Sequence, residues 1–382
     1  MSTRSLIVLG TRPEAIKLAP VIQQAQRHAL IEPLVCSTGQ HREMLAQVLG
    51  YFGIQPDLNL DVMRPNQTLA GLTSRLIEHL NSVVNSTTPD CIVAQGDTTT
   101  VMTASMVAFY NRLPFVHVEA GLRTGNMNAP WPEEYNRRIA GLTASLHCAP
   151  TESSADNLRR EGVPESQIHI TGNTVIDSLL WTSARERENA SVWNEKYEFL
   201  GDSRLVLITG HRRENFGAGF RSVLNGLADL AQRFPETQFL YPVHLNPNVQ
   251  KPVHEMLEGI PNIRLIAPAS YPEFIWLMDR STLIITDSGG VQEEAPSLGK
   301  PVLVTREVTE RPEAVETGAV ELIGTSYDKL MSQATLLLTD EQAYAARQIK
   351  QNPYGDGHAA ERTVRLIAEQ HWGAAATQRE AA

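Results

Sequence analysis

Short apolar runs rich in β-branched residues alternate with helical patterns along the whole chain. In the first half these runs predict strands at residues 5–11, 33–39, 91–97, 115–121, 146–150 and 168–173. Residues 68–84 show the spacing of an amphipathic helix. Strands that are apolar throughout and alternate with helices indicate a parallel sheet covered on both faces. The first half therefore predicts a doubly wound α/β domain.

A long charged stretch at 174–199 leads into a second series of the same kind. Its predicted strands are 205–211, 239–244, 263–269, 283–290, 301–305 and 320–324. We predict an N-terminal Rossmann-like domain at 1–173, a C-terminal one at 174–365, and a last helix at 358–372 that can pack back on the N-terminal domain. The fold class is α/β, with two Rossmann-like doubly wound domains facing a cleft where such sheets bind ligands.

Composition narrows the classes of partner. The 382 residues are 42% hydrophobic and carry a net charge of −10, which argues against nucleic acid as a partner because duplex binders need surplus Lys and Arg. No apolar run reaches the roughly 18 residues needed to cross a bilayer, and the chain opens on a strand rather than a signal peptide, so we expect a cytoplasmic protein without a membrane partner. Cys36, Cys91 and Cys148 lie far apart in apolar segments and are predicted to be buried thiols.

The turn after the first strand reads GTRPEAIKLAP and contains one glycine. Thr11 and Glu14 have the spacing of a capping box, with Pro13 tolerated in the first helical turn. Backbone N–H groups at a helix start attract an anion, and Arg12 and Lys17 are placed to reach it. The alternative is two solvated surface cations with Glu14 as an i,i+3 partner.

Ionisable residues stand where three predicted strands stop, namely Asp97, Glu119 and His211. In this architecture such positions border the ligand site, although Asp97 alone also fits an N-cap for the following helix. Beyond Glu119 the segment PWPEEYNRR brings Glu133 and Arg137 onto a helix start at i,i+4 spacing. The two share a helix face, so a paired carboxylate is predicted beside the cleft. The alternative is an acidic first turn that complements the helix dipole.

In the second half, LIITDSGGVQEE places Ser288, Gly289 and Gly290 between a strand and a helix. Unobstructed backbone N–H groups and a hydroxyl suit a diphosphate there, and Glu294 suits sugar hydroxyls. A plain glycine turn is the alternative, which the strand-to-helix context disfavours. GxxxxGK[ST] is absent, no GxGxxG follows a strand, and the histidines lack metal-ligand spacing, so we predict neither a cofactor nor a metal.

Taken together, the motifs of this sequence resemble one family from about residue 5 to 370. They are GTRPEAIKLAP, TGQHREML, GDTTT, HVEAGLRTG, PWPEEYNRR, ITGNTVIDSLL, TGHRREN, YPVHLNPNV, TDSGGVQEEAPSLGKPVLV, TERPEA and NPYGDGHAAER. They resemble the non-hydrolysing UDP-N-acetylglucosamine 2-epimerases of bacteria. SGG with EE alone is also found in many nucleotide-sugar glycosyltransferases, whereas GTRPEAIK and PWPEE are not.

The resemblance implies the GT-B fold, a homodimer, and reversible conversion of UDP-GlcNAc to UDP-ManNAc for envelope polysaccharide. It implies that UDP is held by Arg12, Lys17, His211, Phe274, Ser288, Gly289, Gly290, Glu294 and Arg311. It implies that the reacting sugar is lined by Asp97, Glu119, Glu133, Arg137 and His211. It also implies a regulatory UDP-GlcNAc site, with UDP-GlcNAc as an allosteric activator, at Gln40, His41, Glu134, Arg212 and His244.

The chemistry of the implied reaction accounts for these residue types. The C2 proton of UDP-GlcNAc is adjacent to no carbonyl, so the expected route eliminates UDP to 2-acetamidoglucal and adds it back with a proton on the opposite face. Three alternatives stay open, namely a hydrolysing epimerase that releases free ManNAc, a GT-B glycosyltransferase, and a non-catalytic nucleotide-sugar sensor. The residues do not decide which carboxylate serves which face of C2.

Overall fold

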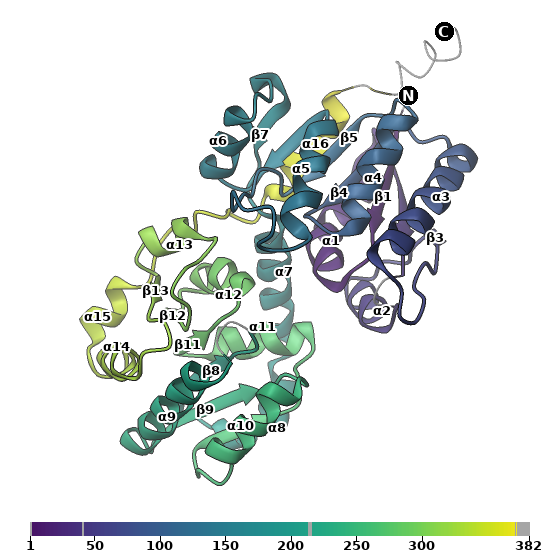
Figure 1. Ribbon diagram of the computed structural model, residues 1–382. Helices are drawn as coiled ribbons and strands as arrows, with labels where there is room; N and C mark the ends of the chain where they lie inside the picture. Colours follow the sequence, from purple (N-terminus) through teal and green to yellow (C-terminus); the bar gives the residue numbers. More distant parts are fainter. Residues whose placement is uncertain (1, 40–41, 213–215, 371, 373–382) are drawn as a thin grey trace, which may run out of the picture. The chain divides into compact units, whose positions relative to one another are not determined.

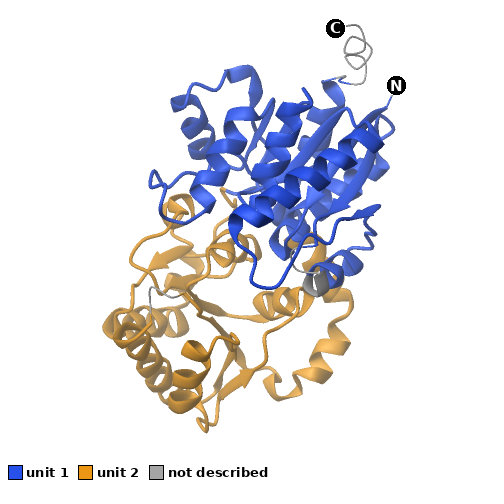
Figure 2. Cartoon of the chain, turned by 45° about the vertical axis from the view of Figure 1, so that its right-hand side comes forward, with its two compact units in different colours: residues 1–178, 354–382 blue, residues 179–353 orange. Residues whose placement is uncertain are grey.

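The computed structural model describes residues 2–39, 42–212, 216–370 and 372 (Figure 1). The chain forms two compact units (Figure 2). Unit 1 comprises Met1–Ser178 and Tyr354–Ala382, and unit 2 comprises Leu179–Pro353. Each unit contains one parallel sheet with helices on its faces. The prediction of two Rossmann-like α/β domains is thereby confirmed.

The sheet of unit 1 has seven strands in the order β3-β2-β1-β4-β5-β6-β7, all parallel. Its strands are β1 (Thr3–Leu9), β2 (Ile31–Ser37), β3 (Leu58–Asn59), β4 (Cys91–Gln95), β5 (Phe115–Val118), β6 (Leu146–Ala149) and β7 (Ile168–Ile170). Its helices are α1 (Arg12–Arg27), α2 (Arg42–Tyr51), α3 (Leu69–Thr87), α4 (Thr99–Tyr110), α5 (Glu133–Thr143), α6 (Glu152–Arg160), η1 (Glu165–Gln167) and α16 (Ala359–Glu369). Helix α7 (Thr174–Glu188) begins in unit 1 and continues into unit 2.

The sheet of unit 2 has six parallel strands in the order β10-β9-β8-β11-β12-β13. Its strands are β8 (Arg204–Thr209), β9 (Thr237–Pro242), β10 (Ile263–Ile266), β11 (Leu283–Thr286), β12 (Val302–Val304) and β13 (Val320–Leu322). Its helices are α8 (Ala190–Lys196), η2 (Glu198–Leu200), α9 (Ala218–Arg233), α10 (Pro247–Leu257), α11 (Tyr271–Arg280), α12 (Gly289–Glu294), η4 (Ala295–Leu298), α13 (Pro312–Glu316), α14 (Tyr327–Thr339) and α15 (Glu341–Ala346). Within the described ranges, no helix combines the length and apolar character that crossing a membrane would need.

Buried faces of strands and helices explain why these segments fold as they do. In unit 1, Leu6 of β1 and Val101 of α4 belong to one fully buried cluster, and in unit 2 Ile208 of β8 packs in a cluster with Leu224 of α9 and Leu330 of α14. Burying one such side chain stabilises the fold by roughly 1.5–3 kcal/mol. The predicted cysteine burial is also confirmed: Cys36, Cys91 and Cys148 are buried free thiols, and burial raises the pKa of each to about 12.

The structure differs from the predicted strands mainly at their carboxyl ends. The strand predicted at 91–97 stops at Gln95, because Gly96 adopts φ 85° and leaves the extended conformation. The two-residue strand β3 was not predicted, since Leu58–Asn59 is too short to show a pattern. The early ends leave Asp97, Glu119 and His211 in turns just beyond the sheets.

The helix that ends the described chain packs within unit 1. Helix α16 contacts α1. The Asp177 carboxylate on α7 accepts the backbone N–H groups of Ala360 at 2.8 Å and Ala359 at 3.2 Å, which begin α16. Nearby, the N–H group of Asn173 donates to the carbonyl of Tyr354 at 2.6 Å. These hydrogen bonds join the two stretches where the chain leaves and re-enters unit 1.

Asp177→Asn is expected to change how stability depends on pH. Burial raises the pKa of the Asp177 carboxyl to about 6, against the hydrogen bonds from α16 that lower it. A raised pKa means that the contribution to stability is complete below the unfolded pKa near 4 and is lost as pH rises through about 6. Relative to Asp177→Asn, the wild type should therefore lose up to about 3 kcal/mol between pH 4 and 7. Melting temperatures of both proteins across this range measure the difference, and a constant difference would contradict the account.

Candidate active site

The predicted site residues fall into two sets, one in each unit, and several members of each set follow the carboxyl ends of neighbouring strands. In unit 1, Arg12, Asp97 and Glu119 follow β1, β4 and β5, which are adjacent in the sheet. In unit 2, His211 and Ser288 follow β8 and β11, which are also adjacent. The β1/β4 and β8/β11 pairs are the points where strand order reverses, and ligands of doubly wound domains bind at such points.

The turn between β1 and α1 is organised by a buried carboxylate. Thr11 is the N-cap of α1 and forms the predicted capping box with Glu14. The Glu14 side chain is 1% exposed and accepts hydrogen bonds from the N–H groups of Gly10 at 2.7 Å and Thr11 at 2.6 Å, and from the Thr98 hydroxyl at 2.5 Å. Burial raises the pKa of Glu14 against these hydrogen bonds, which lower it. The β1–α1 turn is thus fastened to the start of α4.

Lys17 does not pair with Glu14, as the surface-cation alternative required. Its ammonium group forms an ion pair with the Glu119 carboxylate, and its side chain is 16% exposed. The physical reason is that the oxygens of Glu14 accept hydrogen bonds from the turn and from Thr98. Glu119 brings its carboxylate to Lys17 from the end of β5, which lies beyond β4 in the sheet. Lys17 is therefore a partly buried cation held next to a predicted catalytic carboxylate.

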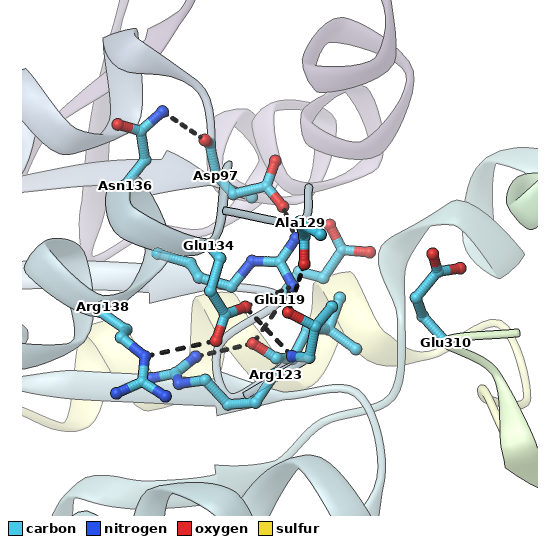
Figure 3. A network of polar contacts seen from close by, with 12 residues as sticks. Asp97, Glu119, Arg123, Ala129, Glu134, Asn136, Arg138 and Glu310 are labelled. Carbon is cyan, nitrogen blue, oxygen red and sulfur yellow. Dashed lines mark hydrogen bonds and ion pairs between the residues drawn. The ribbon is translucent and has the colours of Figure 1, made fainter. Parts of the chain in front are cut away.

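Asp97 is not the N-cap of α4, so that alternative is wrong. The N-cap is Thr98, whose hydroxyl accepts the N–H of Val101 at 3.3 Å. The Asp97 carboxylate instead forms an ion pair with Arg137 of α5, and the Asp97 carbonyl accepts a hydrogen bond from the Asn136 amide at 2.9 Å (Figure 3). The Asp97 side chain remains 28% exposed. Its carboxylate is oriented by α5 while still reaching the surface of the unit.

Glu119 combines an unusual backbone with a crowded carboxylate. It adopts φ 63°, a left-handed conformation that few residues other than glycine occupy. Its side chain is 8% exposed and accepts hydrogen bonds from Lys17, from Gln95 of β4, and from the Asn173 amide at 2.9 Å. Such strain persists where the surroundings fix the conformation, and it is concentrated at functional sites.

The predicted pairing of Glu133 with Arg137 is not present among the described residues. Arg137 reaches Asp97 and also lies 3.4 Å from the carboxylate of Glu134, three residues earlier. Arg137 thus pairs with Asp97 and Glu134 instead of with Glu133. Glu133 is partly exposed in the first turn of α5, where an acidic side chain complements the helix dipole.

Glu134, predicted as a regulatory residue, is fully buried in unit 1. Its carboxylate accepts the N–H groups of Thr124 at 3.1 Å and Gly125 at 3.3 Å and pairs with Arg138 at 3.3 Å (Figure 3). These contacts tie the loop that follows Glu119 to α5. Direct contact between Glu134 and a ligand would require this loop to move.

In unit 2 two histidines stack at the ends of neighbouring strands. The His211 and His244 rings are 5.3 Å apart and inclined by 14°. Burial is the main cause that lowers the pKa of His211; Asp287 raises it, and His244 and Arg212 lower it further. The predicted catalytic histidine is thus in contact with a histidine predicted to be regulatory.

The turn between β11 and α12 brings an arginine against a glycine. A Cβ atom on Gly289 would lie 2.9 Å from Cζ of Arg311, so a larger residue there would displace the guanidinium. The Arg311 guanidinium donates to the Glu293 carboxylate at 2.8 Å. On the adjacent Gly290, a Cβ would lie 3.6 Å from a carboxylate oxygen of Glu294. The structure thus places Arg311 and Glu294 beside the turn that begins at Ser288.

The remaining predicted residues are placed as follows. Phe274 is half-buried in the first turn of α11, whose capping box consists of Ser270 and Glu273. Gln40 and His41 lie outside the described residues. Within the described part of the chain, no group of three or more His, Cys, Asp or Glu side chains has the arrangement of a metal site.

Comparison with known proteins identifies the family. A family model described as UDP-N-acetylglucosamine 2-epimerase matches residues 23–368. A UDP-N-acetylglucosamine 2-epimerase of Yersinia pestis is 52% identical over 366 residues, which cover 95% of this chain and 97% of that protein. This chain belongs to the UDP-N-acetylglucosamine 2-epimerase family. The resemblance inferred from the sequence motifs is confirmed.

Solved structures of UDP-N-acetylglucosamine 2-epimerases share the fold. The Neisseria meningitidis UDP-GlcNAc 2-epimerase bound to UDP-GlcNAc matches with a TM-score of 0.90 and 45% identity, covering 96% of this chain and 100% of that one. An S. aureus protein in a co-structure with UDP matches with a TM-score of 0.85 and 38% identity, covering 96% of each chain. The predicted fold class, two Rossmann-like domains of GT-B type, is thus also found in these relatives.

Several residues of this UDP-N-acetylglucosamine 2-epimerase family member contact the predicted site but were not predicted from the sequence. Gln95 and Asn173 hold Glu119, and Asn136 holds the Asp97 backbone. Asn173 is 54 positions from Glu119, and no spacing rule connects them. Gln95 lies near the predicted Asp97, and Asn136 lies next to the predicted Arg137. For Gln95, the available signal was a polar side chain in an otherwise apolar strand.

Proposed function

We propose that this protein reversibly converts UDP-GlcNAc to UDP-ManNAc by inverting C2 of the sugar. Membership of the UDP-N-acetylglucosamine 2-epimerase family carries the enzyme class. The observation that carries the chemistry is the pair of carboxylates at adjacent strand ends, Asp97 and Glu119, each held by a cation from a helix. Neither side chain is needed as a helix cap, so their positions are explained better by a reaction than by folding.

The proposed route breaks the bond between C1 and the diphosphate oxygen. A base removes the proton from C2, the electron pair forms a C1–C2 double bond, and UDP leaves with the electrons of the C1–O bond. The products of this half-reaction are UDP and 2-acetamidoglucal. UDP then adds back to C1 while C2 receives a proton on its opposite face. Each proton transfer by a positioned side chain contributes a rate factor of about 10²–10⁴.

We propose that one group of residues transfers protons at C2 and that another stabilises the negative charge of the departing UDP. We propose Asp97, Glu119 and Glu133 as the proton-transfer groups at C2, with Arg137 orienting Asp97. Arg12, which begins α1, stabilises the negative charge of the departing UDP together with Lys17, whose ammonium already pairs with Glu119. In unit 2, UDP is proposed to bind His211, Phe274, Ser288, Gly289, Gly290, Glu294 and Arg311.

A product assay tests the proposed function. Purified protein is incubated with UDP-GlcNAc, without added metal or nicotinamide, and followed by ³¹P and ¹H NMR. The proposal predicts UDP-ManNAc approaching a fixed ratio with UDP-GlcNAc from either starting compound. Free ManNAc with stoichiometric UDP as the main product would assign the hydrolysing reaction instead. Turnover that depends on an added sugar acceptor would indicate a glycosyltransferase, and binding of UDP-GlcNAc without turnover would indicate a sensor.

We further propose that the protein is a homodimer that pairs through the outer face of α4 and α5. Phe109 and Tyr110 at the end of α4 are 65% and 66% exposed, and Leu142 at the end of α5 is 82% exposed. The two helices pack together and both run antiparallel to the strands, so these ends lie at the same edge of unit 1. Large apolar side chains gathered on a surface mark an interface.

Leu142→Glu is expected to separate the dimer, because a charge would have to be buried against the partner's apolar face. Size-exclusion chromatography with light scattering should give twice the chain mass for wild type and the chain mass for Leu142→Glu. Val192→Glu is the matched control, since Val192 is 59% exposed on α8 of unit 2 and should leave the mass unchanged. A monomeric wild type, or an unaltered Leu142→Glu dimer, would contradict this surface.

Allosteric activation by UDP-GlcNAc is also proposed, at Gln40, His41, Glu134, Arg212 and His244. The stacking of His244 on His211 supports it, because a change at one ring alters the surroundings of the other. The burial of Glu134 indicates that its contribution is to hold the loop after Glu119 rather than to touch the regulator. The cytoplasmic location and the supply of ManNAc nucleotides for envelope polysaccharide remain predictions.

A further inference from the structure

One carboxylate in unit 2 accepts hydrogen bonds from the backbone at His211 and faces the ring of the same residue. Oδ2 of Asp287 accepts the N–H of His211 at 2.8 Å and the N–H of Arg212 at 2.7 Å. Oδ1 of Asp287 lies 3.4 Å from Nδ1 of His211. The Asp287 carbonyl accepts a hydrogen bond from Nε of Arg212 at 3.1 Å. The turn after β8 is therefore attached to the turn after β11 through one residue.

Asp287 is far more buried than the histidine that it holds. Its side chain is 2% exposed, whereas that of His211 is 45% exposed. Among the described residues, Oδ1 of Asp287 is a buried oxygen that accepts no hydrogen bond within standard geometry. A buried carboxylate oxygen without a donor is costly, and the nearest ionisable group that the structure shows facing it is the His211 ring. A fold that needed only the backbone hydrogen bonds could use asparagine here.

We propose that Asp287 is a positioning residue that fixes the orientation and tautomer of His211 for the epimerase reaction. This rests on the proposed function, in which His211 acts on the bound nucleotide sugar. With Asp287 facing Nδ1, that nitrogen carries the proton, so Nε2 of the neutral ring is left as the acceptor and Nε2 of the charged ring as the donor. This is the arrangement by which a buried aspartate orients a catalytic histidine.

The groups around His211 determine in which direction the pKa of His211 should change when Asp287 is replaced. Asp287 raises the pKa of His211, while burial, His244 and Arg212 lower it. Asp287→Asn removes the only one of these four influences that favours the charged ring. Its amide can still accept the two backbone N–H groups, so the turn should keep its fold. An amide N–H facing Nδ1 would favour the other tautomer, with the proton on Nε2.

The same residue also adjoins the proposed UDP-binding turn. Asp287 directly precedes Ser288, whose N–H donates to the Thr286 hydroxyl at 2.9 Å. The Thr286 hydroxyl lies 2.5 Å from that of Thr209 on β8. The strand ends that carry His211 and Ser288 are thus joined by the contact between Thr209 and Thr286 as well as by Asp287. A rigid link of this kind fixes the position of His211 relative to the proposed diphosphate-binding turn.

The test compares Asp287→Asn with Asp279→Asn, a carboxylate of the same unit that pairs with Arg187 on α7. We expect kcat of Asp287→Asn to fall by about 10²–10⁴-fold with KM and UDP affinity within a few-fold of wild type. The part of the kcat–pH profile that reports His211 should move to lower pH. Asp279→Asn should keep both kcat and the profile. An unchanged profile for Asp287→Asn, or a loss confined to KM, would overturn the proposal.

Two further measurements keep the proposal testable if Asp287→Asn folds poorly or the wild type proves inactive. In wild-type protein, ¹⁵N NMR of the His211 ring should show the proton on Nδ1, and a proton on Nε2 would overturn the proposal without reference to activity. The double variant His211→Asn with Asp287→Asn should be no slower than His211→Asn alone, because the two residues act as a unit. Additive losses would overturn it.

Discussion

Asp97→Asn is expected to abolish exchange of the C2 proton of UDP-GlcNAc while leaving UDP binding largely intact. Asparagine keeps the shape of the side chain but cannot take up a proton, so the rate should fall by about 10²–10⁴-fold. The backbone contact from Asn136 to the Asp97 carbonyl is preserved. Isothermal titration with UDP and an NMR exchange assay, run on the same preparation, separate the two effects.

The loss of the ion pair between Asp97 and Arg137 has to be separated from the loss of the base. Asp156→Asn is the matched control, because Asp156 also pairs with an arginine, Arg159, on the exposed face of α6. It should leave exchange and UDP binding at wild-type levels. Loss of UDP binding in Asp97→Asn would return Asp97 to a structural role, and retained exchange would exclude it as a proton-transfer group.

Glu119→Gln is expected to lose both activity and stability. The Glu119 carboxylate accepts hydrogen bonds from three donors. Glutamine has only one acceptor oxygen, and its NH₂ group would face one of these donors without being able to accept its hydrogen bond. The ion pair with the partly buried Lys17 ammonium would be lost, and breaking a buried pair of this kind costs about 3–5 kcal/mol. Turnover should fall at least about 100-fold, by the loss of a proton-transfer group.

A double-mutant cycle with Lys17→Met tests the stability part of this prediction. Lys17→Met removes the cation, so adding Glu119→Gln to it should destabilise the protein less than Glu119→Gln does alone. Thermal unfolding of the four proteins gives the coupling. Additive changes would show that the ion pair is not formed in solution, and full turnover by Glu119→Gln would exclude Glu119 from the chemistry.

The sheets could be predicted from the sequence because strands buried on both faces are apolar at every position. Leu6, Ile92 and Ile208 lie in such runs, and the structure places each in a strand. Strand ends could not be predicted as well, since the segment CIVAQGD does not show that the extended backbone ends at Gln95, where Gly96 turns to a positive φ. The left-handed backbone of Glu119 carries no local signal, because a non-glycine residue there is held by tertiary contacts.

Residue types at strand ends were enough to propose candidate site residues, but not to predict the partners of these side chains. Lys17 was predicted at the helix start, yet its pairing with Glu119 depends on the adjacency of β1, β4 and β5. Arg137 was predicted on α5, and it pairs with a strand end instead of a residue on its own helix face. From the sequence, Asp287 is only a residue of a glycine turn, and its position next to the His211 ring is evident only from the structure. Contacts between residues that are distant in the sequence could therefore be found only once the fold was known.

The central claim, proton exchange at C2 through elimination and readdition of UDP, is tested most directly in D₂O. Purified protein is incubated with UDP-GlcNAc in D₂O without added metal or nicotinamide, and the C2–H signals are followed by ¹H NMR. The account predicts UDP-ManNAc that carries deuterium at C2, with deuterium also entering the UDP-GlcNAc pool. Formation of UDP-ManNAc that retains its C2 proton, or no exchange at all, would contradict it.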